Sequence, residues 1–367
     1  MNHLIISTCG TSIFSGGAPT DIRQLLIDHA NDRRDSDIVE PSSRQRIVEH
    51  TQQRQHELLQ TTDLRVLCAR SAEIAALSAY YGGQFTRSDQ HILLATDTWL
   101  CEQSAKTIAA VLGAKGQAIV EIKRLTDLRT DDLVAYRQAL SELVKWLYQI
   151  IPGYRQANYK IVFNLTGGFK GVQGFMQTLG ALLADECVYV FERSEQLIRM
   201  PRLPLQLQPE PYIRNHLRQF RRMSLGLTVA ADEVQSIPEL MLFVDDGQAT
   251  LSEWGEVVWR ELRDVLYSEQ IHPSPSDKLF WDDEFTRSIG TLEKRRLREI
   301  NLRIADVARF LETGLALKST DLKAIKGPAQ RGATHEIDAW HDGDAKRIYG
   351  HFEAECFKLD RLDVALH

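Results

Sequence analysis

The 367-residue sequence lacks a long apolar run and an excess of basic charge. Its longest apolar stretches, such as 92–95 and 108–112, fall far short of the roughly 18 residues that cross a membrane, so we expect no transmembrane helix. Met1-Asn2-His3 carries no basic segment of a signal peptide, and we expect a cytoplasmic protein without a membrane partner. The 44 Lys and Arg against 50 Asp and Glu give a net charge of -6, which disfavours a broad nucleic-acid coat.

Cysteine is also scarce. The five cysteines are scattered and odd in number, and no two have the spacing of metal ligands, which indicates a reducing compartment. A hydrophobic content of 43% and a charged content of 26% are ordinary for a globular chain, and the length favours two or three domains.

Residues 1–193 alternate short apolar runs with amphipathic stretches in which apolar residues recur every three or four positions. The runs predict strands at 4–7, 64–68, 91–95, 117–122, 159–164 and 187–191. The stretches between them predict helices near 21–30, 44–59, 72–80, 98–112, 131–150 and 171–183. Strict alternation of strand and helix predicts an α/β domain with a parallel sheet covered on both faces.

The pattern changes twice after this domain. Four prolines between 201 and 211 indicate its exit, because proline removes ladder donors. The next segment has helical patches at 212–223 and 251–267 and a Pro- and Ser-rich linker at 271–276. A long helical pattern then stops near Gly314, and strands at 334–340, 346–352 and 362–366 complete an α+β layout. We therefore expect three parts: 1–210, a small helical linker module at 211–277, and 278–367.

Two loops at strand ends combine glycine with hydroxyl or amine groups. The first strand ends in Ser7-Thr8-Cys9-Gly10-Thr11-Ser12, and the strand at 159–164 leads into Asn164-Leu165-Thr166-Gly167-Gly168-Phe169-Lys170-Gly171 and a helix. Helix N-termini favour anions, Lys170 adds positive charge, and both loops lie at the carboxyl edge of the sheet, where ligands bind. Neither loop is a Walker A or Gly-x-Gly-x-x-Gly motif, which disfavours an ATPase or an NAD enzyme.

Together these loops resemble those of the CARF domain, the CRISPR-associated Rossmann-like sensor of antiviral defence. The resemblance covers roughly residues 1–210 and implies a homodimer that binds one cyclic oligoadenylate across its two-fold axis, with cyclic tetra-adenylate as activator and no other cofactor. Some CARF domains also cleave their ring slowly, for which Ser12 and Lys170 are the candidates. The implied ligand contacts are Thr8, Cys9, Gly10, Thr11, Ser12, Thr166, Gly167, Gly168, Phe169 and Lys170.

Two nuclease chemistries fit the last part of the chain unequally. A metal nuclease needs clustered carboxylates or histidines, yet strand alternation places His335 on one face and Glu336, Asp338 and Trp340 on the other, so we expect no metal. Metal-free RNA cleavage needs a base for the 2′-OH, an acid for the leaving 5′-oxygen and a cation on the phosphorane-like transition state. Arg, Lys, His and Glu on a small sheet supply all three.

The order of these segments resembles the RelE family of ribosome-dependent mRNA interferases. An Arg-rich helical hairpin precedes Leu322-Lys323-Ala324-Ile325-Lys326-Gly327, a His335-Glu336 strand and Lys346-Arg347-Ile348-Tyr349. The resemblance implies an endoribonuclease whose partners are the ribosome and mRNA, with Arg347 on the scissile phosphate. Asp338 departs from the family, which often has a basic residue there. The implied catalytic residues are Arg347, Glu336, Lys326, Lys323, His335 and His367.

Other basic residues leave alternatives open. For one group of arginines, two roles are equally expected: they face RNA from one side of a helix, or they form structural salt bridges. These are Arg295, Arg296, Arg298 and Arg303. His341 and His351 are expected to be ordinary surface residues. A CARF transcription regulator is one alternative function, with DNA contacts from Arg214, Arg218, Arg221 and Arg222. A ring nuclease with an inactive last domain is another. Residues 278–367 hold 16 basic and 16 acidic residues, and this neutrality fits a substrate that a ribosome presents.

Overall fold

A computed structural model describes residues 1–86, 88–117, 119–191, 196–202, 209–315, 322–325 and 332–364. The chain forms two compact units, Met1–Gln206 and Leu207–His367. The three-part division of the sequence therefore stays a prediction, while the α/β class of the first unit is confirmed.

The first unit contains a six-stranded sheet in the order β3-β2-β1-β4-β5-β6. Its strands are β1 (Asn2–Thr8), β2 (Gln90–Ala95), β3 (Ile119–Arg124), β4 (Tyr159–Asn164), β5 (Glu186–Val190) and β6 (Leu197–Pro201). Five strands are parallel, and β6 pairs antiparallel with β5 at one edge. The sequence did not predict β6, whose last residue is a proline that an edge position tolerates.

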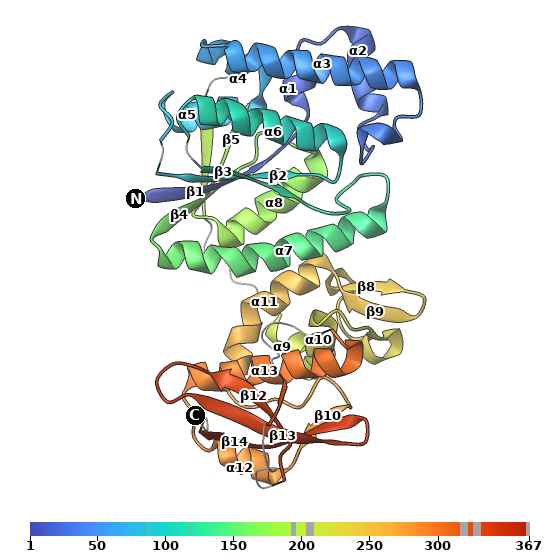
Figure 1. The fold of residues 1–367 in the computed structure, drawn as a ribbon, viewed down its shortest axis with the longest axis vertical. Coiled ribbons are helices and arrows are strands. Elements are labelled where there is room, and N and C mark those ends of the chain that lie inside the picture. The colour runs from blue at the N-terminus through green and yellow to red at the C-terminus, as the bar shows by residue number, and fades with distance from the viewer. Residues whose placement is uncertain are drawn as a thin grey trace. The chain divides into compact units, whose positions relative to one another are not determined.

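Helices cover both faces of this sheet (Figure 1). They are α1 (Ser12–Ser15), α2 (Thr20–Asp28), the 3-10 helix η1 (Asp35–Asp37), α3 (Pro41–Gln60), α4 (Leu64–Arg70), α5 (Ala72–Tyr80), α6 (Trp99–Ala114), α7 (Leu133–Gln156) and α8 (Lys170–Leu183). Figure 1 shows α5 and α6 on one face, α7 and α8 on the other, and α3 outside α6. Apolar residues of β1, β2 and α6 are wholly buried between these layers.

The predicted strand at 64–68 is wrong, because these residues begin helix α4. Asp63 caps this helix by accepting a hydrogen bond from the Arg65 N–H. Leu64 and Leu67 then lie on one helical face, and Leu67 is fully buried in the core. A five-residue apolar run fits both periods, and here the cap and tertiary packing decide for helix.

The second unit begins with helices around a three-stranded sheet that the sequence did not predict. The sheet has the order β7-β9-β8. Its elements are α9 (Glu210–Asn215), α10 (Leu217–Ser224), β7 (Val229–Ala230), the 3-10 helices η2 (Ala231–Val234) and η3 (Glu239–Met241), β8 (Leu242–Asp245), β9 (Gln248–Leu251) and α11 (Glu253–Tyr267). The segment predicted as a linker is partly buried: His272 is 3% exposed, and its N–H donates to the Asn301 side chain at 3.0 Å.

A five-stranded sheet in the order β10-β14-β13-β12-β11 follows. The remaining elements are β10 (Leu279–Trp281), α12 (Asp283–Ile289), α13 (Lys294–Thr313), β11 (Lys323–Ala324), β12 (His335–Trp340), β13 (Lys346–Glu353) and β14 (Cys356–Val364). The long helical pattern breaks at Gly290, and Gly314 ends α13 in the left-handed conformation at φ 70°, as predicted. Helices followed by an antiparallel meander confirm the α+β layout.

Candidate functional sites

The first candidate site lies where the strand order of the parallel sheet reverses. β1 and β4 are neighbours, with Ser7 in register with Asn164, while the strands following each of them extend the sheet in opposite directions. A crevice forms at the carboxyl ends of such a strand pair, because the following connections leave on opposite sides. The two predicted loops, 8–12 and 166–170, start at this point. The two loops therefore lie together at the carboxyl edge of the sheet, and ligand binding there stays a prediction.

The two loops contact each other directly. The Thr8 hydroxyl donates to the Gly167 carbonyl oxygen. A Cβ on Gly10 would lie 2.8 Å from the Gly168 nitrogen, closer than side-chain carbons approach backbone, so position 10 requires glycine. Gly168 adopts φ 101°, which only glycine reaches without strain. The sequence analysis assigned these glycines to ligand contact. In the structure, they allow the two loops to contact each other.

Glu73 on α5 contacts both loops, and no sequence motif pointed to it. Its carboxylate accepts the Gly10 N–H at 2.8 Å and the Ser71 hydroxyl at 2.8 Å. A Cβ on Gly167 would collide with the same carboxyl group. Burial raises the pKa of Glu73, while the Gly10 and Ser71 hydrogen bonds oppose that shift. The Gly10 N–H is thus already used and cannot bind phosphate in this arrangement.

The predicted contact residues differ in exposure. Lys170 is exposed, and Thr11, Ser12, Gly168 and Phe169 are partly exposed. Lys170 also begins α8, where the preceding Phe169 has no side chain that can cap the helix, which leaves first-turn N–H groups for an anion.

The other predicted contacts are less accessible. Thr8, Cys9 and Gly167 are buried. The Cys9 thiol packs in the core, where burial and the nearby Glu73 raise its pKa, so any contact from Cys9 would come from its backbone. Thr166 is fixed by its hydroxyl, which donates to the Asn164 side-chain oxygen at 2.9 Å. The accessible functional groups are therefore Thr11, Ser12, Lys170 and the start of α8.

The second candidate site is a charged cluster on the sheet of the second unit. Arg347 on β13 donates to Glu336 at 2.7 Å and to Asp338 at 3.0 Å, both on β12. Lys323 on β11 lies opposite Glu336 in the ladder, with its Nζ 3.9 Å from Asp338. The structure thus brings three predicted catalytic residues together. Burial alone would lower the pKa of Arg347, but the two carboxylates raise it and keep the guanidinium charged.

Two further residues of this face were missed by the sequence analysis. Tyr349 lies opposite both Glu336 and Arg361 in the ladders, and the Arg361 guanidinium stacks over its ring at 4.9 Å. Arg361 is 6% exposed and also lies 3.6 Å from Asp363. The cluster therefore contains a second arginine. Only the register of β13 against β14, with its bulge at residues 349–350, reveals that pairing.

The other predicted catalytic residues lie elsewhere or outside the described residues. His335 contacts the rings of Phe352 and Phe357, at 5.1 and 6.0 Å, on the strand face opposite Glu336. Lys326 and His367 lie outside the described residues. His351, predicted as an ordinary surface residue, is held by Asp360 and Glu353.

Strand alternation predicted one residue of β12 wrongly. A bulge between Asp338 and Trp340 turns Trp340 into the core, where it is 5% exposed. Its ring stacks beneath Arg296 at 4.5 Å, and its indole N–H donates to the Asp344 carbonyl at 2.8 Å. Asp342-Gly343-Asp344 lies in the connection between β12 and β13.

The remaining arginine groups form ion pairs within the second unit. On α13, Arg295 and Arg296 bind Asp342 at 2.7 and 2.8 Å, which favours the salt-bridge alternative. On α9 and α10, the four arginines weighed as DNA contacts are also occupied. Arg221 is 1% exposed and donates to the His272 carbonyl at 2.8 Å, and the others pair with carboxylates: Arg214 with Glu269, Arg218 with Asp277 and Arg222 with Glu312.

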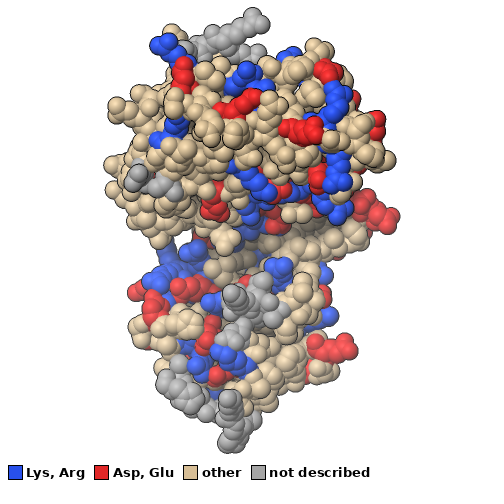
Figure 2. Space-filling model, turned by 45° about the horizontal axis from the view of Figure 1, so that its top comes forward, with Lys and Arg blue, Asp and Glu red and all other residues tan. Residues whose placement is uncertain are grey.

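The charge pattern and side-chain chemistry limit other site types. Figure 2 shows basic and acidic side chains interspersed over the face in view. Within the described ranges, no three His, Cys, Asp or Glu side chains gather closely enough to hold a metal ion. Among the helices that the structure describes, none is both long and apolar enough to span a bilayer.

Comparison with known proteins gives one family match. Residues 69–203 match the model of a CRISPR-associated protein family (Cas_APE2256), a segment that includes the 166–170 loop and excludes the 8–12 loop. Among solved structures, Csm6 of Enterococcus italicus bound to cyclic hexa-2'-fluoro-hexa-dAMP shares 12% identity at a TM-score of 0.30. The alignment covers 85% of this chain and 64% of that chain. The search of curated proteins found no match. Over residues 69–203, this chain is similar to a CRISPR-associated protein family.

Proposed function

We propose that the protein is a type III CRISPR ancillary effector in which cyclic oligoadenylate binding by the first unit activates RNA cleavage by the second. The observation that carries this proposal is that the loops 8–12 and 166–170 contact each other where the strand order of the parallel sheet reverses. The family match supports it, because the matched segment contains the loop that ends in Lys170.

The first unit would bind its ring through accessible groups of both loops. Lys170 and the first-turn N–H groups of α8 favour phosphate oxygens, and the Thr11 hydroxyl adds a neutral donor. A cyclic tetra-adenylate is itself two-fold symmetric, so a homodimer that joins two such loop pairs would match it residue for residue.

The second unit would cleave RNA without a metal. The 2′-oxygen forms a bond to phosphorus as the bond to the 5′-oxygen breaks, which yields a 2′,3′-cyclic phosphate and a 5′-hydroxyl. A base removes the 2′-OH proton, and an acid returns a proton to the 5′-oxygen. Arg347, with Arg361 and Lys323 on the same face, would stabilise the charge that develops on the phosphate oxygens. Glu336, which accepts a hydrogen bond from Arg347 at 2.7 Å, is the candidate base.

In this structure, two carboxylates occupy the guanidinium of Arg347 in the charged cluster. An RNA phosphate that approaches Arg347 must compete with Glu336 and Asp338 for its N–H groups. Because the surrounding segment is electrically neutral, free RNA gains little from long-range attraction. A ribosome that holds the mRNA would position it at the cluster, which this weak attraction alone would not do.

Incubation of the protein with ribosomes and mRNA, with and without cyclic tetra-adenylate, tests the proposal. We expect cleavage that depends on the ring and withstands EDTA at concentrations that preserve the ribosome. Arg347→Ala should lower the cleavage rate by about 100-fold or more, the effect typical of removing a transition-state donor. Arg287→Ala, an exposed arginine of α12 that donates to its own helix, is the matched control.

Two outcomes would contradict different parts of the proposal. Ring-dependent cleavage that Arg347→Ala leaves unchanged would remove the assignment of this cluster. An absence of cleavage with every ring size, despite measurable ring binding, would refute the ribonuclease and leave the ligand site standing.

A further inference from the structure

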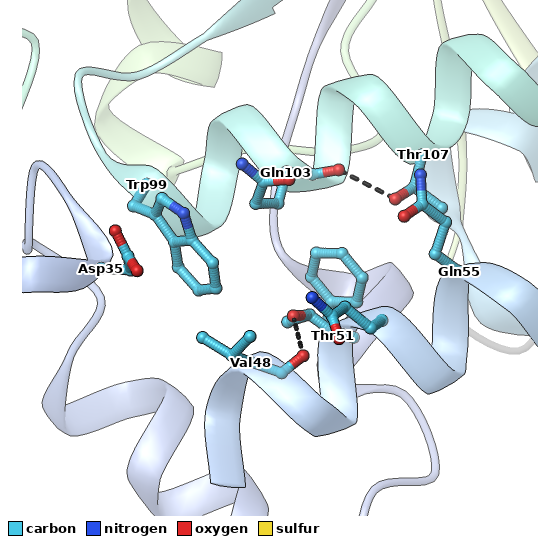
Figure 3. Close-up of a pocket in the computed structure, with 9 residues that line it drawn as sticks. Asp35, Val48, Thr51, Gln55, Trp99, Gln103 and Thr107 are labelled. Carbon is cyan, nitrogen blue, oxygen red and sulfur yellow. Dashed lines mark hydrogen bonds between the residues drawn. The ribbon is translucent and has the colours of Figure 1, made fainter. Parts of the chain in front are cut away.

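A half-open cavity of about 270 Å³ lies between α3 and α6 of the first unit (Figure 3). It shares no residue with the two loops or with the arginine cluster. Trp99, Gln103 and Thr107 line it from α6, and the facing side chains of α3 are Thr51, Gln52 and Gln55.

These residues form a seam, a line of facing side chains between α3 and α6. Packed helices normally bury apolar side chains at such a position, whereas several side chains here are polar. Trp99, Gln103 and Thr107 recur at four-residue intervals and share one face of α6. Positions 48, 51, 52 and 55 share one face of α3 in the same way. The apolar side chains of Phe14 and Val48 also line the seam, and Gln52 is exposed to solvent. The cavity therefore combines apolar and aromatic surface with amide and hydroxyl groups.

The hydrogen-bonding groups of the cavity are of two kinds: hydroxyls that can only accept, and amides that both donate and accept. The Thr51 hydroxyl donates to the Val48 carbonyl at 2.8 Å, and the Thr107 hydroxyl donates to the Gln103 carbonyl at 2.9 Å. With their protons used, both hydroxyls can only accept from a ligand. The side-chain amides of Gln52, Gln55 and Gln103 line the same cavity. Each amide offers a donor and an acceptor side by side.

The cavity disfavours an anionic ligand. Among the residues that the structure describes, no Lys or Arg lines it, and its one charged lining residue is Asp35 of η1. Arg44 pairs with that carboxylate at 2.6 Å, so the rim is close to neutral. Trp99 is partly exposed, and Figure 3 shows its indole ring at one end of the cavity, beside the α6 and α3 side chains.

We propose that this cavity binds a neutral purine base, as a nucleoside or as one base of a larger nucleotide whose phosphates lie outside it. The Trp99 ring supplies the stacking surface on which unpaired bases bind. A glutamine amide pairs with the adjacent donor and acceptor of a purine edge, as glutamine does with adenine in nucleic-acid complexes. The α6 stripe spans about 12 Å from residue 99 to 107, which suits the long axis of a bicyclic base.

Isothermal titration of the full-length protein with adenosine, guanosine and uridine tests this site directly. We expect adenosine or guanosine to bind and uridine to bind at least about tenfold more weakly. Trp99→Ala and Gln103→Leu should each weaken purine binding by about tenfold or more, the loss typical of a stacking partner or a paired amide. Gln53→Leu is the matched control, because Gln53 bonds to Glu57 on the exposed side of α3.

The Gln103→Leu variant keeps the side-chain volume, so it separates lost recognition from lost folding if Trp99→Ala unfolds. Lys170→Ala should retain purine binding, since Lys170 belongs to the ring-binding loop. The proposal is overturned if neither purine nucleoside binds at millimolar concentration, if uridine binds equally well, or if Lys170→Ala abolishes the binding and thereby places the nucleoside in the loops.

Discussion

Replacing Gly10 by alanine tests whether contact between the two loops shapes the ligand site. The added Cβ would lie 2.8 Å from the Gly168 nitrogen and 3.3 Å from the Gly168 Cα. Ordinary contact begins at 3.4 Å, so the loops must separate by about 0.6 Å. Both clashing groups are backbone atoms, which cannot rotate away as a side chain would.

The cost of such overpacking is typically about 1–3 kcal/mol of unfolding free energy. For a unit of this size, that corresponds to a fall in Tm of several degrees. Separation also lengthens the bond from the Gly10 N–H to Glu73, so Lys170 and the first turn of α8 lose their position relative to Thr11 and Ser12. We expect affinity for cyclic tetra-adenylate to fall by about tenfold or more.

Urea unfolding and titration calorimetry measure the two effects on the same preparation. Gly113→Ala is the control, because Gly113 lies in α6 with no atom within 4 Å of its added Cβ. Alanine there should raise stability by about 0.5–1 kcal/mol through helix propensity. A Gly10→Ala protein with the urea midpoint and ring affinity of the wild type would refute the argument that the loops are in contact.

Three further changes probe other parts of the molecule. Leu67→Ala should lower the unfolding free energy of the first unit by about 2–5 kcal/mol, because Leu67 is fully buried, and a loss below about 1 kcal/mol in urea titrations would contradict its place in the core. The hydrogen bond to Asp360 raises the pKa of His351, so its stabilisation is complete below about pH 6.5 and is lost as pH rises through the higher folded pKa. The stability difference between wild type and His351→Gln should therefore shrink from about pH 5.5 to about pH 9, and a constant difference would disprove the coupling. Asp338→Asn should raise ribosome-dependent cleavage at least about twofold by releasing one carboxylate from Arg347, whereas reduced cleavage would mean that Asp338 positions that arginine.

Much of the first unit could be predicted because its strands are apolar runs flanked by turn residues. The exception at 64–68 arises because a short apolar run carries no reliable period, and the Asp63 cap acts through a backbone conformation that sequence alone does not determine. The edge strand β6 escaped prediction because its partner, β5, supplies the pairing that its own residues do not indicate.

The two loops were identified in the sequence from their glycine and hydroxyl groups. The residue that supports them, Glu73, was not identified. Glu73 lies more than sixty residues after Gly10 in sequence, and its contact depends on how α5 packs beneath the sheet edge. In the second unit, the sequence placed Glu336 and Arg347 in one site, and the structure joins them directly. The pairing of Tyr349 with Arg361 depends on strand register and a bulge, which residue types do not specify.

The joined loops have a consequence for how a ligand would arrive. Thr8 and Glu73 hold residues 10 and 167 together in the free protein, so few backbone angles remain to be ordered when a ring binds. Little conformational entropy would then be lost in this unit on association, and the association rate would be limited by encounter more than by loop rearrangement.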